Sequence, residues 1–340
     1  MRKLMLGLLL VLLVAGCGGS RNAPKPAGQA KAGPGGADYA HASMRQTTVG
    51  GGGDKAWIFE PADPAPEQAP VIVLLHGWGN WGPVVYKQWI THLVRRGNIV
   101  IHPKYQTNHL TLPIHMTANA VKGVRAALAE LKKDGHVHFD GEHFAVAGHS
   151  LGGVIAANLA ATAEETGLPQ PLAVMCALPG DPKLARFSQQ LNRTINVELA
   201  SIMVDYAAIP QGTLLLVIVG DRDKVVGDAT AKVLWQRVQH LPAADRDYVA
   251  FQSDDHGRPK LKAIHVTPAA PTAGSLMDYT KSTTNAFDYY GTWKLLDGLT
   301  DAAFYGRNRA YALGNTPEQR YMGTWSDGTP VKELFVLDKE

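Results

Sequence analysis

The chain has 340 residues, and 45% of them are hydrophobic, so the chain can bury a large core. Its 33 Lys and Arg residues and 30 Asp and Glu residues give a net charge of +3, with no basic stripe interleaved with aromatic residues. This balance argues against a nucleic-acid partner. The two cysteines, Cys17 and Cys176, are too few for a disulfide framework.

The first residues form an export signal. A basic head over residues 1–3 precedes an apolar run over residues 4–14, which is too short to span a bilayer stably. Cys17 then follows two small residues, and this pattern resembles the signal of bacterial lipoproteins. The resemblance implies a signal peptide over residues 1–16, acylation of Cys17 and a lipid-anchored protein of the cell envelope. If the host is Gram-negative, the expected location is the periplasmic or outer-membrane face. An ordinary secretory signal is the alternative.

Residues 17–45 are rich in Gly, Ala, Pro and Lys and contain few large apolar side chains. Such a segment cannot bury enough surface to offset its ordering entropy, so we expect a flexible tether. The remaining residues, 46–340, suit a single α/β domain, which we expect to be monomeric.

Strand-like and helix-like segments alternate along this domain. Continuous apolar, β-branched runs predict strands, and apolar residues on one helical face predict helices. The predicted strands are Val71–Leu75, Asn98–Ile101, Phe144–Ala147, Leu172–Ala177, Leu214–Val219 and Asp247–Gln252. The predicted helices are Val84–Arg96, Thr117–Lys133, Leu151–Glu165 and Ala229–His240. The alternation predicts an α/β fold, with a mostly parallel central sheet flanked by helices.

Two segments depart from this alternation. Residues 180–212 carry apolar side chains at helix-like spacing between two predicted core strands, which suits either an ordinary crossover helix or a cap over the active site. Residues 275–340 form a C-terminal extension whose aromatic residues indicate a packed helix followed by a turn-rich tail. We assign no chemistry to this extension.

The motif Gly148-His149-Ser150-Leu151-Gly152 lies between a predicted strand and a predicted helix. This is the context that the nucleophile elbow of a serine hydrolase needs. Small residues must flank so tight a turn, and the serine then projects beside the unpaired N–H groups of a helix N-terminus. The motif predicts Ser150 as a nucleophile; a tight turn without chemistry is the alternative.

A second glycine motif, His76-Gly77-Trp78-Gly79, directly follows the predicted strand Val71–Leu75. Together the two motifs resemble those of α/β-hydrolase lipases and esterases, over about residues 55–260. The resemblance implies an α/β-hydrolase fold and an oxyanion hole formed by the backbone N–H groups of Trp78 and Leu151. A plain glycine turn after the strand is the alternative.

The serine needs a base, and the base needs an orienting carboxylate. In the family that the motifs resemble, the order along the chain is serine, acid, histidine. Asp223, in the turn after the strand Leu214–Val219, matches the position of the family acid, with Asp221 as the alternative. His256, in the loop after the last predicted strand, matches the position of the family base, with His265 as the alternative.

The sequence therefore predicts a serine hydrolase that cleaves small-molecule carboxylic esters through an acyl-enzyme. Two alternatives stay open: another serine acyl hydrolase (an amidase, peptidase or thioesterase), or a non-catalytic envelope lipoprotein with a hydrolase fold. We expect no cofactor and no metal. Three histidines crowd together before the strand Phe144–Ala147, namely His136, His138 and His143. Ser150 follows the other end of that strand, so in a parallel sheet these histidines lie at the opposite edge from Ser150.

Overall fold

The computed structural model describes residues 23–80, 82–108, 111–195, 199–270 and 283–337. The predicted signal peptide over residues 1–16 and the predicted lipidation site Cys17 lie outside these ranges. Within them, no helix is both long enough and apolar enough to cross a membrane.

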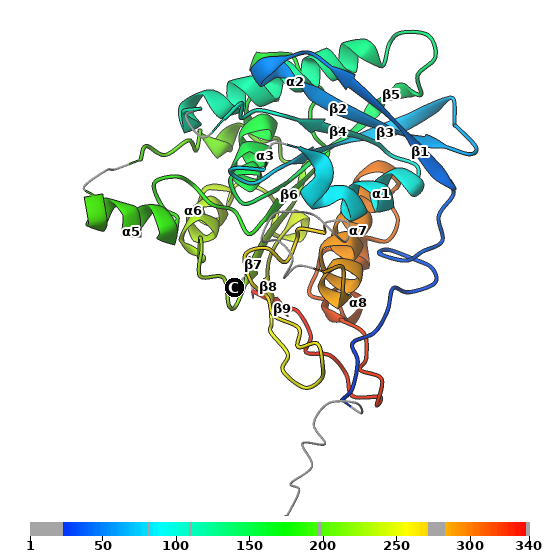
Figure 1. Ribbon diagram of the computed structural model, residues 1–340, viewed down its shortest axis with the longest axis vertical. Coiled ribbons are helices and arrows are strands. Elements are labelled where there is room, and N and C mark those ends of the chain that lie inside the picture. The colour runs from blue at the N-terminus through cyan, green and yellow to red at the C-terminus, as the bar shows by residue number, and fades with distance from the viewer. Residues whose placement is uncertain (1–22, 81, 109–110, 196–198, 271–282, 338–340) are drawn as a thin grey trace, which may run out of the picture.

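A nine-stranded sheet forms the centre of the described chain (Figure 1). Its strands are β1 (Ser43–Val49), β2 (Ala56–Ala62), β3 (Gln68–Leu75), β4 (Ile99–Pro103), β5 (His138–His149), β6 (Ala173–Ala177), β7 (Leu214–Gly220), β8 (Arg246–Phe251) and β9 (Phe335–Val336). They are ordered β1-β2-β4-β3-β5-β6-β7-β8-β9. The run from β4 to β8 is parallel, and β1, β2 and β9 are antiparallel additions at its edges. The predicted mostly parallel sheet is confirmed.

Helices cover both faces of the sheet. They are α1 (Lys87–Arg95), α2 (Met116–Glu130), α3 (Leu151–Ala161), α4 (Ala163–Thr166), α5 (Arg186–Ile195), α6 (Ala229–Arg237), α7 (Trp293–Tyr305) and α8 (Pro317–Arg320). The core of one face contains α2, α3 and α6, and the core of the other contains α1 and α7. In β3, Val71 and Val73 face the first core, whereas Ile72 and Leu74 face the second. Because alternate side chains point to opposite faces and both faces are buried, the strand is apolar throughout.

The predicted strands and helices are all present, with shifted ends. β5 begins at His138 rather than Phe144, because its first residues pair with β3 ahead of a register shift. The predicted helix Val84–Arg96 starts as a 3₁₀ turn over Pro83–Tyr86. The strands β1, β2 and β9 were not predicted. β1 has no fully buried residue and therefore no apolar run, Glu60 and Pro61 interrupt the apolar run of β2, and β9 has only two residues.

The two unusual segments differ in how they join the core. Residues 180–212 include α5, which projects at the periphery beside α6 (Figure 1). The buried carboxylate of Asp181 draws the two ends of the segment together by accepting hydrogen bonds from Ser201 and Ile202, and the Asp181 N–H joins the segment to α6 by donating to Thr230 Oγ1 at 3.0 Å. A role for 180–212 as a cap stays a prediction. In the C-terminal extension, the described residues from 283 onward belong to the core: α7 packs on the sheet and β9 pairs with β8.

Residues 23–42 pack along the domain, which differs from the flexible tether predicted over residues 17–45. The dark blue segment runs past α8 towards β1 in Figure 1. Lys25 and Ser326 exchange two hydrogen bonds, and the Gly35 N–H donates to the Asp297 carboxylate at 2.7 Å. Gly35 has φ +77°, and an added Cβ would lie 1.9 Å from the Tyr289 carbonyl oxygen. Composition does not reveal such docking, because backbone groups make these contacts.

Asp297, on α7, is the polar centre of this packing. Its buried carboxylate accepts hydrogen bonds from Gly35 and from His92 Nε2 (2.9 Å), and it lies 3.1 Å from Arg96 Nε. Burial alone would raise the pKa of Asp297, but His92, Arg96 and the Gly35 N–H lower it on balance. The carboxylate thereby joins the N-terminal segment, α1 and α7.

Replacing Asp297 with Ala should lower the free energy of unfolding by about 3–5 kcal/mol, because it leaves buried donors without their shared acceptor. Chemical denaturation would measure the change. Asp38→Ala is the matched control, since Asp38 is an exposed partner of the same Arg96 at 3.2 Å and should contribute less than about 1 kcal/mol. Equal losses in the two variants would contradict the assigned role.

The contribution of Asp297 should also depend on pH. A carboxyl with a lowered folded pKa stabilises fully above its unfolded pKa of about 4, and the stabilisation is lost as the pH falls through the folded pKa. The stability gap between the wild type and Asp297→Ala should therefore be constant near neutral pH and shrink in acid.

Candidate active site

Ser150 occupies a strained turn between β5 and α3. Its backbone has φ +58° and ψ −125°, a conformation that costs energy for a residue with a side chain. Neighbouring segments of the protein hold this turn. The Ser150 N–H donates to the Ala177 carbonyl at the end of β6 (3.0 Å), and the Ser150 carbonyl accepts from the N–H groups of Gly153 and Gly180. The side chain is thereby fixed at the carboxyl edge of the sheet, where the residue is 8% exposed.

The two glycines of the motif make the turn possible. A Cβ on Gly148 would lie 2.0 Å from the Gly152 carbonyl oxygen, and a Cβ on Gly152 would lie 2.4 Å from the carbonyl oxygens of Leu75 and His76. Neither contact is sterically possible, so α3 can approach β3 and β5 this closely only with glycine at both positions. The geometry agrees with the requirement for small flanking residues that the motif implies.

The structure places His265, and not His256, against Ser150. His265 Nε2 lies 2.9 Å from Ser150 Oγ, and His265 Nδ1 lies 2.8 Å from Asp223 Oδ2. An ionised carboxylate can only accept hydrogen bonds, so Nδ1 carries the proton and Nε2 is left to accept the Ser150 O–H. Serine, histidine and aspartate thus form one hydrogen-bonded chain, with the residue that the sequence offered as the alternative base.

His256 lies in a separate, exposed pair. Its Nε2 is 2.8 Å from Asp327 Oδ2, and both side chains are more than a third exposed. The prediction of His256 as the base is therefore not supported by the geometry. The cause is the path of the chain after β8: Asp254 and Leu261 form a bridge that loops out the residues between them, including His256.

After this excursion the chain returns to the acid turn. The Ala263 carbonyl accepts from the Arg222 N–H at 3.0 Å, and a Cβ on Gly220 would lie 2.6 Å from that carbonyl oxygen. This close approach places His265 over Asp223. The family pattern had indicated His256, because it places the base in the loop directly after the last strand. The available signal was local: Ile264 and Val266 flank His265 with apolar side chains, whereas charged residues surround His256.

Asp223 has its predicted position beside the histidine. Its side chain is fully buried, and Oδ1 accepts from the N–H groups of Val225 (2.8 Å) and Val226 (3.1 Å). Burial would raise the pKa of Asp223, but the hydrogen bond and charge of His265 and the two amide donors lower it on balance. The carboxylate is therefore ionised at neutral pH. The alternative, Asp221, instead binds Ser253 through both of its carboxylate oxygens.

The two segments that carry the predicted oxyanion donors both approach Ser150. Leu151 is the first residue of α3, so its N–H points out of the helix start. The loop that carries Trp78 passes close by, since a Cβ on Gly77 would lie 3.2 Å from Ser150 Cβ. The Gly79 N–H donates to Gln106 Oε1 at 2.8 Å, which ties this loop to the chain after β4. The arrangement is compatible with the predicted oxyanion hole, which stays a prediction.

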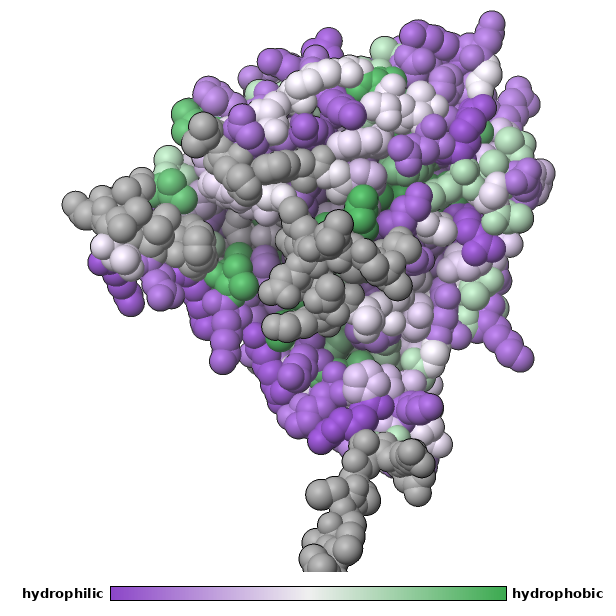
Figure 2. All heavy atoms as spheres, viewed as in Figure 1, coloured by the Kyte–Doolittle hydropathy of each residue, from purple (hydrophilic) through white to green (hydrophobic). Residues whose placement is uncertain are grey.

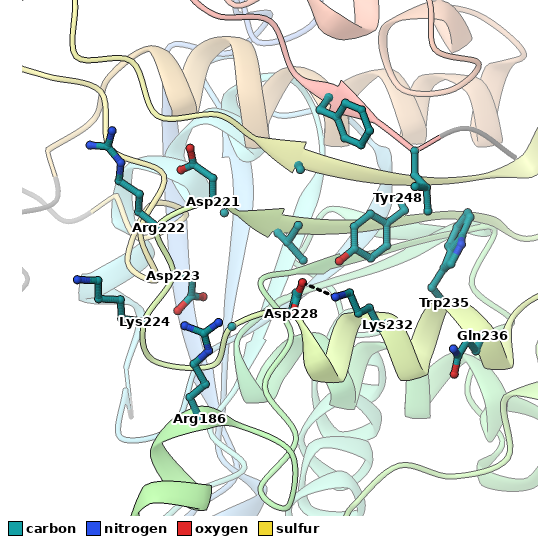
Figure 3. A pocket seen from close by; sticks show the side chains of 16 residues that line it. Arg186, Asp221, Arg222, Asp223, Lys224, Asp228, Lys232, Trp235, Gln236 and Tyr248 are labelled. Atoms are coloured by element: carbon teal, nitrogen blue, oxygen red, sulfur yellow. Dashed lines mark ion pairs between the residues drawn. The ribbon is translucent and has the colours of Figure 1, made fainter.

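A cavity of about 530 Å³ adjoins the acid turn (Figure 3). In this view, Asp223 and Arg186 point towards each other, and Lys232 pairs with Asp228 at 2.8 Å. Trp235 and Tyr248 line its far part. Among the described residues, the lining includes Asp223 but neither Ser150 nor His265. The cavity therefore borders the acid without opening onto the serine.

The three histidines near the start of β5 have separate partners, and His138 Nδ1 lies 2.9 Å from the Leu131 carbonyl oxygen. His143 Nδ1 lies 2.8 Å from Asp140, and His136 Nδ1 lies 2.9 Å from Glu60. In the part of the chain that the structure describes, no cluster of three or more His, Cys, Asp or Glu residues has the geometry to hold a metal ion.

Comparison with known proteins points to a hydrolase. The family model for chlorophyllase matches residues 54–193, less than half of the chain, and includes Ser150. This match supports membership of a hydrolase superfamily. A non-reducing polyketide synthase from Acremonium egyptiacum is 24% identical over 155 residues, which are 43% of this chain and 7% of that protein. The chain thus spans only a small part of that relative, whose overall activity carries no weight here.

Replacing Gly152 with Ala should lower the free energy of unfolding by about 1–3 kcal/mol or more, because the added Cβ overlaps the backbone of β3. Thermal denaturation would measure the loss. Gly212→Ala is the control, since a Cβ there meets nothing within 4 Å. Unchanged stability in Gly152→Ala would show that the close contact between α3 and β3 is absent in solution.

Proposed function

We propose that the protein is a serine hydrolase that cleaves carboxylic esters through an acyl-enzyme, with Ser150 as nucleophile, His265 as base and Asp223 as orienting acid. The observation that carries the proposal is the chain of two hydrogen bonds, 2.9 and 2.8 Å long, from Ser150 through His265 to Asp223. The chlorophyllase family match supports the same conclusion, because it suggests an ester-cleaving hydrolase. The elbow at Ser150, with its positive φ, is a third, independent support.

In the proposed reaction, the three side chains act in two half-reactions. Ser150 Oγ attacks the ester carbonyl carbon as His265 Nε2 takes the hydroxyl proton. The tetrahedral intermediate then collapses, and the alcohol leaves with the proton from His265. A water molecule, deprotonated by the same nitrogen, attacks the acyl-enzyme, and the second collapse releases the acid and restores the Ser150 O–H. Asp223 keeps the proton on Nδ1 and stabilises the imidazolium.

The backbone N–H groups of Trp78 and Leu151 are the proposed oxyanion donors. They lie on the two chain segments that meet at Ser150, one after β3 and one at the start of α3. Fixed donors aimed at the developing negative charge each contribute a few kcal/mol to such reactions.

The surroundings favour esters with apolar groups. Exposed apolar side chains occur on the loops that leave β3, β4 and β7, namely Trp78, Leu112, Ile114 and Val225. Because the carboxyl ends of parallel strands share one edge, these loops surround the same edge as Ser150. The surface in Figure 2 is mostly hydrophilic, with separate apolar patches. Apolar side chains around a polar reaction centre fit an apolar acyl or aryl group.

The envelope location and the lipid anchor at Cys17 rest on the pattern of residues 1–17 alone and stay predictions. An amidase, peptidase or thioesterase would use the same three residues, so a panel of matched esters, thioesters and amides would distinguish these activities. A non-catalytic lipoprotein would fail to react with a fluorophosphonate, which labels only activated serines.

Ser150→Ala should abolish hydrolysis of short p-nitrophenyl esters and fluorophosphonate labelling, because it removes the nucleophile. His265→Ala should lower kcat by at least about 10⁴-fold, as loss of a triad member does in related mechanisms. His256→Ala is the matched control and should retain wild-type kcat, because His256 contacts Asp327 instead of Ser150. If His256→Ala lost activity while folded His265→Ala kept it, the assigned base would be wrong.

Replacing Leu112 and Ile114 together with Ser should lower kcat/KM for octanoyl esters about tenfold and leave acetyl esters unaffected, because only the longer chain reaches these side chains. Initial rates across an acyl series would show this. Tyr305→Ser is the control, since Tyr305 is equally exposed but lies beside His143 at the opposite edge of the sheet. An equal loss on both esters would contradict the proposed acyl site.

A further inference from the structure

A chain of buried polar groups lies beneath Ser150. The Gly77 N–H is 2.9 Å from the Tyr86 hydroxyl oxygen, that oxygen is 2.8 Å from His149 Nδ1, and His149 Nε2 is 2.7 Å from the His265 carbonyl oxygen. Tyr86 is fully buried and His149 is 2% exposed. We call these four groups the relay. It joins the loop that carries Trp78 to the loop that carries His265.

The direction of each hydrogen bond in the relay is fixed. The His265 carbonyl can only accept, so His149 carries its proton on Nε2 and presents Nδ1 as an acceptor. Tyr86 therefore donates its O–H to His149 and accepts the N–H of Gly77. Burial, together with the neighbouring His265, lowers the pKa of His149 to about 3, so the ring is neutral at physiological pH.

We propose that Tyr86 and His149 are positioning residues for ester hydrolysis, which hold the backbone of the base loop and the backbone of the oxyanion loop at a fixed separation around Ser150. This inference rests on the proposed function. The two loops are far apart in the sequence: one follows β3 and the other lies beyond β8. A relay through β5 and the chain before α1 connects them across the site.

The neutrality of His149 matters for the base as well. The rings of His149 and His265 are 4.9 Å apart between centroids. His265 becomes positively charged in each half-reaction, and a second positive charge at this distance would oppose that step. A buried neutral imidazole supplies a donor to the His265 carbonyl without adding charge. A Lys or Arg at this position would supply the donor together with the repulsion.

Tyr86→Phe and His149→Phe test the relay, because the first keeps the ring and removes only the hydroxyl, and the second replaces the imidazole with a somewhat larger ring that forms no hydrogen bonds. Both should lower kcat about 10–100-fold with little change in KM, since small misplacements of reacting groups cost rates of this order. Active-site titration with a fluorophosphonate gives the rate for each reactive serine. It thereby separates loss of positioning from loss of folded enzyme.

Two further substitutions at position 149 distinguish the bonds. The side-chain amide of Gln can place an N–H where Nε2 lies, so His149→Gln should recover most of the kcat lost in His149→Phe. Asn is one bond shorter and cannot reach the His265 carbonyl, so His149→Asn should not. Recovery with Asn and not with Gln would contradict the proposed bond.

The double variant Tyr86→Phe, His149→Phe should be no slower than the slower single variant, because one relay can be broken only once. Affinity for a boronic acid that mimics the tetrahedral intermediate should fall by the same factor as kcat/KM. Additive losses in kcat, or unchanged boronate affinity, would overturn the inference.

Tyr206→Phe is the matched control. Tyr206 is also fully buried and donates its O–H to Asn158 at 2.9 Å, in the opposite core. It should lower the melting temperature and leave kcat for each titrated serine unchanged. If Tyr86→Phe and His149→Phe behaved in the same way, the relay would be structural only and the inference would be wrong. If the wild-type enzyme took up no fluorophosphonate at all, the proposed function itself would fail.

Discussion

The strained backbone of Ser150 is the constraint on which the site depends. Its left-handed conformation persists because the end of β6, Gly153 and Gly180 all hydrogen-bond to the same residue. This conformation also requires α3 to start in contact with the carbonyl oxygens at the end of β3. Only glycine at position 152 allows that contact. The serine can therefore project only if β3, β5 and β6 end at the same edge of the sheet, and their parallel pairing in the central sheet places their ends there.

The sequence predicted those parts of the fold and site that depend on local pattern. Continuous apolar runs located the core strands, and the glycine motifs located Ser150 and the loop before it. Asp223 was found because it follows its strand within one turn. His265 was missed because its position depends on a tertiary excursion, the bridge between Asp254 and Leu261, and the apolar residues that flank it are only a weak local signal. The docking of residues 23–42 was missed for a related reason: backbone groups make its main contacts, and composition is silent about them.

The similarity to known proteins and the geometry of the site concern different residues. The family match ends at residue 193, so it includes Ser150 but neither Asp223 nor His265. These two residues lie outside the match, and hydrogen bonds link them to the serine and to each other. The family match and the contacts of Ser150, His265 and Asp223 support the proposed hydrolase independently, because the match does not include the segments that hold His265 and Asp223.

The docked N-terminal segment has a consequence for how an anchored enzyme would meet its substrate. Pro24 and Lys25 are already bound to the domain, through Arg258 and Ser326. If Cys17 carries lipid, the distance from this anchor to Pro24 is at most about 25 Å, the length of a fully extended chain between the two residues. A tether of that length is shorter than the width of a domain of this size. The enzyme would then stand on the bilayer in a restricted range of orientations, with the end that holds Ser326 facing the lipid, and its access to substrate would depend on that orientation.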